Sequence, residues 1–414
     1  MNRSGNFCKP LTWFAALLLV AFVAGCGGGG GGGGTTAAGA GAGGAVLPGA
    51  AGTTGAAATN PTVGSSRPSN GAINVPTSTD GPGVTVTGTL VTATFTQAMD
   101  PATIISPAAT FTLKQTAAGT NVPGTVTMNA SSTVATFTPT AAALLPNTSY
   151  TATVTTAAMS ALPAHTAMPS TVAWSFTTSA ALSTGQSSPD IGTASTYGVF
   201  ASAAAVNLNG TAVVHGDVGL NPAGACNGCV VGVSIIGGVI HNGDAAAIQA
   251  QTDFNSAYTD ASTRATNACA ITGDLSAAQG ACGAGFSPGT PGPIYGPGLY
   301  RTATAIGLSG SMTLDAGGNP DAVFIFQSNT AITTATNSTV ILANGAKAEN
   351  VWWIAGSAAT LGVSSTFNGT VIANGAAVTV LGGTALAPTT VTGRMFSHAA
   401  GVTVDTFATV TVPQ

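Results

Sequence analysis

The stretch that decides the fold reads NPDAVFIFQ and covers residues 319–327. It lies in a C-terminal half that carries almost no charge and is rich in Gly, Thr, Ser and Ala. Two companion stretches flank it. GVIHNGDAAA lies upstream at residues 238–247, and NVWWIAGSAATLG lies downstream at residues 350–362.

Corner–strand–corner units recur through this half of the chain. They read NLNGTAVVHGDVGL at 207–220, GLSGSMTL at 307–314, LGVSSTFNGTVI at 361–372 and VLGGT at 380–384. Small residues stand where a coil would turn, and β-branched or aromatic residues stand where it would pack. The spacing is irregular, and the pattern indicates a β-solenoid.

Together these segments resemble the microbial ice-binding family that is built on a discontinuous β-solenoid, often called the DUF3494 family. The resemblance runs from about Asp190 to the C-terminus, so we assign residues 190–414 to such a domain. It implies a helix that covers one face of the solenoid, and it implies an ice crystal surface as the partner.

One helix interrupts the solenoid pattern, and its own sequence predicts it. Apolar residues follow Asp244 at the 3–4 spacing of a single buried stripe, namely Ala247, Ala250, Phe254, Ala257/Tyr258 and Ala261. Asn242 or Asp244 suits the N-cap, and Arg264 suits the last turn.

Residues 60–179 form a second unit. Alternating strand patterns at 90–95, 133–137 and 150–154 are separated by Gly- and Pro-containing turns, and about seven short strands predict a β-sandwich. ATFTQAMD (93–100) and WSFTT (174–178) resemble bacterial Ig-like domains. Residues 180–189 read as a polar linker. The predicted fold class is all-β with one long helix: an N-terminal Ig-like β-sandwich followed by a discontinuous β-solenoid with a helix packed along one face.

The first 59 residues predict export and a tether. A basic start, an apolar run and Val-Ala-Gly-Cys ending at Cys26 resemble a lipoprotein signal peptide over residues 1–26, with Cys26 lipidated. An ordinary signal peptide with a coincidental Cys is the alternative. Residues 27–59 are a Gly/Ala/Thr-rich flexible tether. We therefore expect a lipid anchor in the cell envelope, at the outer membrane or cell surface.

Four cysteines lie outside the expected signal peptide, which contains Cys8 and Cys26. An even number in an exported chain suggests disulfides with three possible connectivities. The shortest loops pair Cys226 with Cys229 and Cys269 with Cys282. A redox or metal role for the Cys226–Cys229 motif is the alternative.

Composition excludes several functions. Charged residues are 5% and the net charge is −4, which gives no basis for nucleic-acid binding. We predict no metal, no cofactor and no catalytic residues, since His215, His241 and His398 lack metal-ligand spacing and no nucleophile elbow precedes a helix.

An ice-binding surface needs a flat, regular, uncharged face. Thr334-Ala335-Thr336-Asn337 fits the T-A/G-x-T/N pattern of ice-binding faces in the family, and Ser357-Ala358-Ala359-Thr360 is a looser version one coil later. The resemblance thus implies ice-binding residues on the face that the helix leaves free: Thr334, Thr336, Asn337, Ser357 and Thr360. Plain solenoid surface is the alternative, because Thr is simply a good strand residue. We predict an ice-binding (antifreeze) lipoprotein that inhibits ice recrystallisation or attaches the cell to ice. The alternative is a surface adhesin or structural envelope protein whose solenoid binds glycan or protein. An envelope glycan or protein is a further expected partner, bound through the Ig-like domain.

Overall fold

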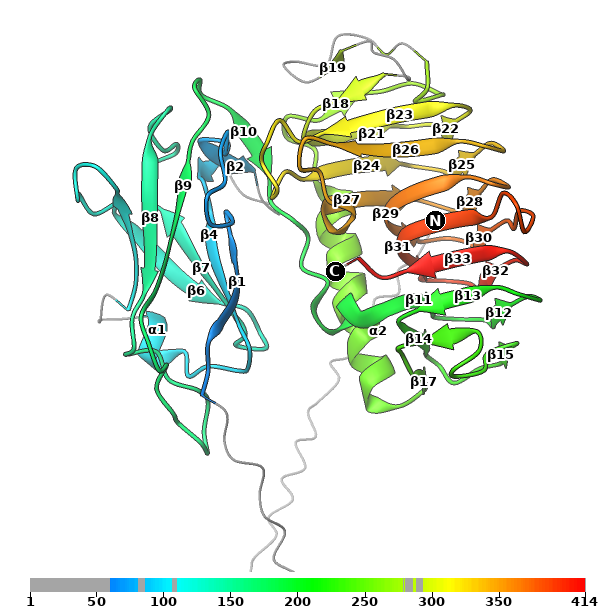
Figure 1. The fold of residues 1–414 in the computed structure, drawn as a ribbon, viewed down its shortest axis with the longest axis horizontal. Helices are drawn as coiled ribbons and strands as arrows, with labels where there is room; N and C mark the ends of the chain where they lie inside the picture. Colours follow the sequence, from blue (N-terminus) through cyan, green and yellow to red (C-terminus); the bar gives the residue numbers. More distant parts are fainter. Residues whose placement is uncertain are drawn as a thin grey trace, which may run out of the picture. The chain divides into compact units, whose positions relative to one another are not determined.

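The computed structural model describes residues 60–80, 86–105, 110–277, 279, 286–287 and 293–413. These residues form a β-sandwich and a β-solenoid, which we describe separately (Figure 1). Cys26, the tether and Cys282 lie outside the described residues. No helix in the described part of the chain is long and apolar enough to cross a membrane.

The Ig-like part is a sandwich of two antiparallel sheets, ordered β1-β4-β7-β6 and β5-β8-β9, with a small third sheet ordered β10-β2-β3. Its elements are β1 (Val63–Arg67), β2 (Ser78–Asp80), β3 (Thr87–Gly88), β4 (Val91–Phe95), α1 (Ala102–Ile105), β5 (Phe111–Gln115), β6 (Gly124–Met128), β7 (Val134–Pro139), β8 (Ser149–Val154), β9 (Val172–Thr177) and β10 (Thr184–Gln186).

Alternation builds the core of this sandwich. In β4 and β7 every second residue is buried, as the period of a strand requires. The rings of Phe137 and Trp174 both pack against Phe111. The strands predicted at 90–95, 133–137 and 150–154 correspond to β4, β7 and β8. The segment that reads as a linker contains β10, which pairs in parallel with β2.

The solenoid has three faces, and each is a stack of strands that pair in parallel, except for the antiparallel pair of β19 and β20 at one end (Figure 1). The helix face contains β17 (Ile240–Asn242), β14 (Asp217–Leu220), β11 (Tyr197–Ala201), the second halves of β31 (Thr389–Ser397) and β29 (Thr366–Ala373), β27 (Val351–Ala355), β24 (Phe324–Ser328), β21 (Gly298–Thr302) and β18 (Cys269–Ala270).

The narrow face, named for its strands of two or three residues, contains β15 (Cys226–Asn227), β12 (Val206–Leu208), β32 (Val402–Val404), β30 (Val378–Val380), β28 (Ala359–Leu361), β25 (Ile332–Thr334) and β22 (Ile306–Leu308). The third face contains β16 (Ile235–Ile236), β13 (Val213–His215), β33 (Ala408–Thr411), the first halves of β31 and β29, β26 (Thr339–Ala343), β23 (Ser311–Asp315), β20 (Ile294–Tyr295) and β19 (Phe286–Ser287). Two 3₁₀ turns, η1 (Gly192–Thr196) and η2 (Ala348–Asn350), complete the elements.

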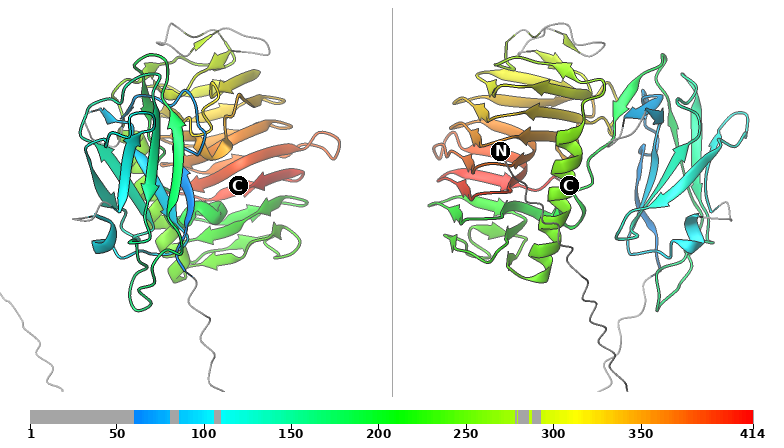
Figure 2. Two further views of the ribbon diagram at one scale, coloured as in Figure 1. Left: turned by 60° about the vertical axis from the view of Figure 1, so that its left-hand side comes forward. Right: turned by 180° about the vertical axis from the view of Figure 1, so that it is seen from behind.

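The stacking order differs from the chain order, which makes the solenoid discontinuous. β12 pairs with β32, and β11 pairs with β31, so the C-terminal coil lies between the N-terminal coils and the rest of the stack. Helix α2 (Ala245–Thr263) runs along the stack and connects the N-terminal coils to the opposite end (Figure 2). Its 19 residues span about 28 Å.

The helix forms as its sequence predicts. The Asp244 carboxylate accepts a hydrogen bond from the Ala247 amide at 2.8 Å and caps the first turn. The buried side chains of the helix are Ala247, Ala250, Phe254, Ala257 and Ala261. They pack on apolar residues of the helix face such as Phe200 and Phe396. The predicted helix on one face is therefore confirmed.

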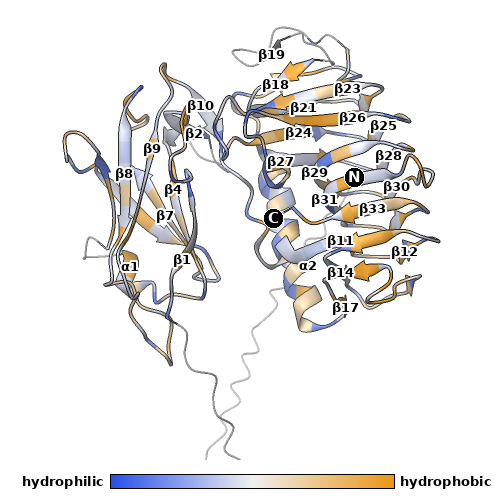
Figure 3. Ribbon diagram, viewed as in Figure 1, coloured by the Kyte–Doolittle hydropathy of each residue, from blue (hydrophilic) through white to orange (hydrophobic). Residues whose placement is uncertain are grey.

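The solenoid core is apolar along its length (Figure 3). Phe326 stacks on Trp353 with ring centroids 4.4 Å apart. The stretch at residues 319–327, quoted first above, therefore contributes to this core. β31 pairs with β29 over eight residues without a register shift. Before β31, Thr384 and Ala387 exchange backbone hydrogen bonds at 3.0 and 3.1 Å and close a turn.

Candidate functional site

The narrow face has one outward residue per strand. In β30 and β32 the two valines are buried and the central threonine is half-buried. The same pattern, with apolar ends and a polar centre, holds in β12 and β28. Each strand therefore fixes its central side chain on the surface by burying its two neighbours.

Backbone pairing aligns these central residues in one straight row, which we call the central row. Register pairs join Thr333 to Thr360, Thr360 to Thr379, Thr379 to Thr403, and Thr403 to Asn207. The complete row is Gly307, Thr333, Thr360, Thr379, Thr403, Asn207 and Asn227. Neighbouring strands lie about 4.8 Å apart, so Thr333 to Asn227 covers about 24 Å. No member of the row is charged.

A second row of residues runs beside the central row. Its residues are all Ala or Gly, so their side chains project little from the face. It contains Ala331, Ala358, Ala377, Gly401, Ala205 and Ala225. Their carbonyls accept hydrogen bonds from the first residues of the neighbouring strands, for example Ala359 N–H to Ala377 O at 3.1 Å. The parallel ladder thus extends beyond the short strands, and the face is regular over two rows.

Thr334 is not on this surface, and its assignment as an exposed ice-binding residue is wrong. It is 4% exposed, and its register partner is the core residue Leu308. Its Oγ1 accepts a hydrogen bond from the Gly362 amide at 2.8 Å. Its neighbour Thr333 takes the outward position instead, because side chains alternate along a strand.

The other predicted residues divide between strand and turn. Thr360 occupies the centre of β28 and belongs to the central row. Thr336 and Asn337 are exposed in the turn after β25, where Asn337 has a φ of 61°. Ser357 is half-buried in the turn before β28. Only Thr360 of the predicted set therefore stands in the row.

The sequence prediction missed Thr333, Thr379 and Thr403. A usable signal was present, since Val378-Thr379-Val380 and Val402-Thr403-Val404 are identical triplets. Both lie in the structure as stacked strands of the narrow face. Repeated apolar–Thr–apolar triplets between turns therefore indicate which residue faces outward, and the T-A/G-x-T/N pattern of the family is not needed for this.

The third face also carries threonines, in pairs along single strands. Thr390 and Thr392 are exposed on β31, and Thr409 and Thr411 are half-buried on β33. Towards both ends of the stack, however, the outward positions are taken by aliphatic side chains such as Ile236 and Ile341. The third face is thus the less uniform of the two faces that the helix leaves free.

Cys226 and Cys229 are joined in a disulfide with an Sγ–Sγ distance of 2.01 Å, at the end of the narrow face. Cys269 is also disulfide-bonded, whereas Cys282, its expected partner, lies outside the described residues. Among the residues that the structure describes, no group of three or more His, Cys, Asp or Glu side chains could hold a metal ion.

Comparison with known proteins assigns the family. The profile of the ice-binding-like family matches residues 199–411, about half of the chain, and the chain belongs to this family. A bacterial Ig-like domain profile matches residues 57–178.

Among curated relatives, the ice-binding protein of Nostoc sp. (strain HG1) is 33% identical over 183 residues, which cover 44% of this chain and 61% of the relative. Ice-binding protein 1 of Shewanella frigidimarina is 28% identical over 56% of this chain and 27% of its own length. The matches thus span less than two thirds of these two relatives. The crystal structure of the ice-binding protein from Antarctomyces psychrotrophicus is 32% identical, covers 55% of this chain and 100% of its own, and has a TM-score of 0.46.

Proposed function

We propose that this protein binds ice crystals through the narrow face of its solenoid. The observation that carries this proposal is the central row, in which four successive strands each present a threonine in register. Membership of the ice-binding-like family supports the same function.

The chemistry of the row suits a crystalline water surface. A threonine offers a methyl group beside a hydroxyl, and its β-branch restricts χ1, so each group stands in a fixed direction. The backbone ladder repeats these groups at a constant step. Charged side chains would hold their own liquid-like hydration, and the central row has none. The small second row allows the face to approach a flat surface closely.

The proposed role of the whole chain is non-catalytic. Binding to ice would inhibit recrystallisation or attach the cell to ice. We further propose that Cys26 carries a lipid and that residues 27–59 form the tether. About 33 residues of Gly-rich coil span roughly 30 Å root-mean-square, enough to hold the folded part away from a membrane.

Uptake into ice tests this function. The purified protein is added to water around a slowly growing ice hemisphere, and its concentration in the ice is compared with that of an unrelated control protein. We expect enrichment in the ice. Exclusion to the level of the control would contradict ice binding and would favour an adhesin or structural protein of the envelope.

A further inference from the structure

One end of the stack is formed by residues 222–243, which contain β15, β16 and β17 and which we call the terminal coil (Figure 1). From 218 to 240 the sequence has no charged and no aromatic residue. Four of the twelve exposed large hydrophobic side chains of the described residues nevertheless lie here, namely Val230, Val231, Val233 and Val239. The terminal repeat of a solenoid normally turns a polar surface to solvent. An exposed aliphatic surface at this end therefore indicates an interaction site.

The loop that carries most of these valines is held in one conformation. The disulfide between Cys226 and Cys229 closes its start. Ser234 Oγ donates a hydrogen bond to the Gly228 carbonyl at 2.7 Å and accepts one from the Val230 amide at 2.8 Å. A surface that is already ordered loses little conformational entropy when it binds a partner.

Two strands of the terminal coil have a free edge. Among the described residues, β15 pairs only with β12, and β17 pairs only with β14. The amides of Ile240 and Asn242 in β17 point away from β14 and donate to no group in the described part of the chain. The edge of β16 differs, because Val231 forms a bridge to Ile235 there. Free backbone donors and acceptors favour pairing with another strand edge.

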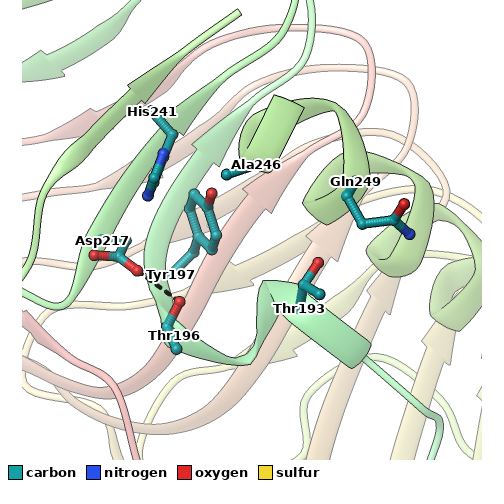
Figure 4. Close-up of a pocket in the computed structure, with 7 residues that line it drawn as sticks. All are labelled: Thr193, Thr196, Tyr197, Asp217, His241, Ala246 and Gln249. Carbon is teal, nitrogen blue, oxygen red and sulfur yellow. Dashed lines mark hydrogen bonds between the residues drawn. The ribbon is translucent and has the colours of Figure 1, made fainter. Parts of the chain in front are cut away.

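The charged groups that follow and precede this neutral segment are engaged on the helix face, where Figure 4 shows Asp217 and His241 beside the start of α2. Asp217 accepts hydrogen bonds from Thr196 Oγ1 at 2.6 Å and from the Val239 amide at 2.9 Å. Asp244 caps α2 and lies 2.8 Å from His241 Nδ1. Because residues 218–240 also lack Lys and Arg, the terminal coil does not suit an anionic lipid surface.

We propose that the terminal coil binds the terminal coil of a second copy of this chain, end to end about a two-fold axis. A two-fold axis across the stack reverses the winding of the second solenoid, so facing edge strands run antiparallel and can exchange backbone hydrogen bonds. The same rotation brings the exposed valines of one copy against the apolar end of the other. A head-to-tail stack would need a matching surface at the opposite end, which instead finishes in the antiparallel pair of β19 and β20. The assembly is therefore a closed dimer and not a filament.

Sedimentation of the purified full chain over a wide range of concentration measures this association, which does not depend on ice. We expect a reversible equilibrium between monomer and dimer. Hydrogen exchange adds a local measurement, because the Ile240 and Asn242 amides should exchange more slowly as the dimer forms. A wild-type protein that stays monomeric at every concentration would overturn the proposal. A dimer in which these two amides exchange as fast as in the monomer would overturn it as well.

One variant and a matched control locate the interface. Val233 is 70% exposed, so Val233→Asp should leave the fold intact. A carboxylate buried on each side of the two-fold axis should raise the dissociation constant of the dimer at least about tenfold. Leu386→Asp places the same group at a 98% exposed position in the turn before β31, and it should dimerise like the wild type. Melting curves check that both variants are folded. Dimerisation of Val233→Asp at wild-type strength, or equal weakening in both variants, would place the interface elsewhere and refute the assignment.

Discussion

Thr333 and Thr334 are adjacent in β25 and have opposite environments. Thr333 is exposed in the central row, whereas Thr334 is buried and accepts the Gly362 N–H. The hydroxyl of Thr334 thus satisfies a backbone donor inside the solenoid. Its loss would leave that donor unpaired in a place that water does not reach.

We expect Thr334→Val to lower the free energy of unfolding of the solenoid by about 1–3 kcal/mol, because the buried Gly362 N–H loses its acceptor. Thr333→Val changes an exposed position and should stay within about ±0.5 kcal/mol. Denaturant unfolding of the two variants measures both values. Equal stability of the two would mean that Thr334 does not serve as this acceptor.

Composition explains why the sequence did not distinguish these two residues. Ile332-Thr333-Thr334-Ala335-Thr336 has threonine at odd and even positions, so it carries no apolar–polar alternation. Where alternation exists, as in Val378-Thr379-Val380, the outward residue follows from the triplet alone. The outward positions were therefore predictable at Thr360, Thr379 and Thr403. In β25 the sequence did not indicate whether Thr333 or Thr334 faces outward.

Helix α2 is the element that the sequence predicted best. Nineteen residues give five turns, and a stripe repeated over five turns is hard to produce by chance. Strands of three residues give no comparable period. The narrow face is therefore defined by long-range register, which a local pattern does not contain.

The cap of this helix is testable. Asp244→Ala should lower the melting temperature, because the Ala247 amide loses its acceptor, and Asp244→Asn should lower it less, because Asn also caps. The folded-state pKa of Asp244 lies below its ordinary value. The contribution of its charge is thus present above that ordinary value and is lost as the pH falls through the folded-state pKa. Melting curves of both variants at neutral and acidic pH measure this. A melting temperature of Asp244→Ala equal to that of the wild type at neutral pH would contradict the cap.

The order of the stack belongs to the whole molecule. Val206 pairs with Val402, almost two hundred positions away in the chain, and no local sequence pattern predicts such a contact. The solenoid was predictable as a class from its irregular repeats and family resemblance. The position of the C-terminal coil between earlier coils was not, because it depends on the pairing of β11 with β31 and of β12 with β32, which are far apart in the chain and share no local pattern.

Anchoring is a second property of the whole chain. If Cys26 is lipidated, Cys26→Ala should move the protein from the membrane fraction to the soluble fraction, or leave it unprocessed. Cell fractionation with mass analysis of the N-terminus decides this. A Cys26→Ala protein that is processed and still sediments with membranes would show that another feature anchors it.

The most direct test of the central claim compares one substitution on each free face. Thr360→Tyr places a ring in the middle of the central row, and Thr392→Tyr places the same ring at an exposed position of the third face. Both proteins should retain the melting temperature of the wild type. The measurement is uptake into a growing ice hemisphere. We predict that Thr360→Tyr is excluded from ice and that Thr392→Tyr is taken up like the wild type. Normal uptake of a folded Thr360→Tyr protein, with exclusion of Thr392→Tyr, would contradict the account and move ice binding to the third face.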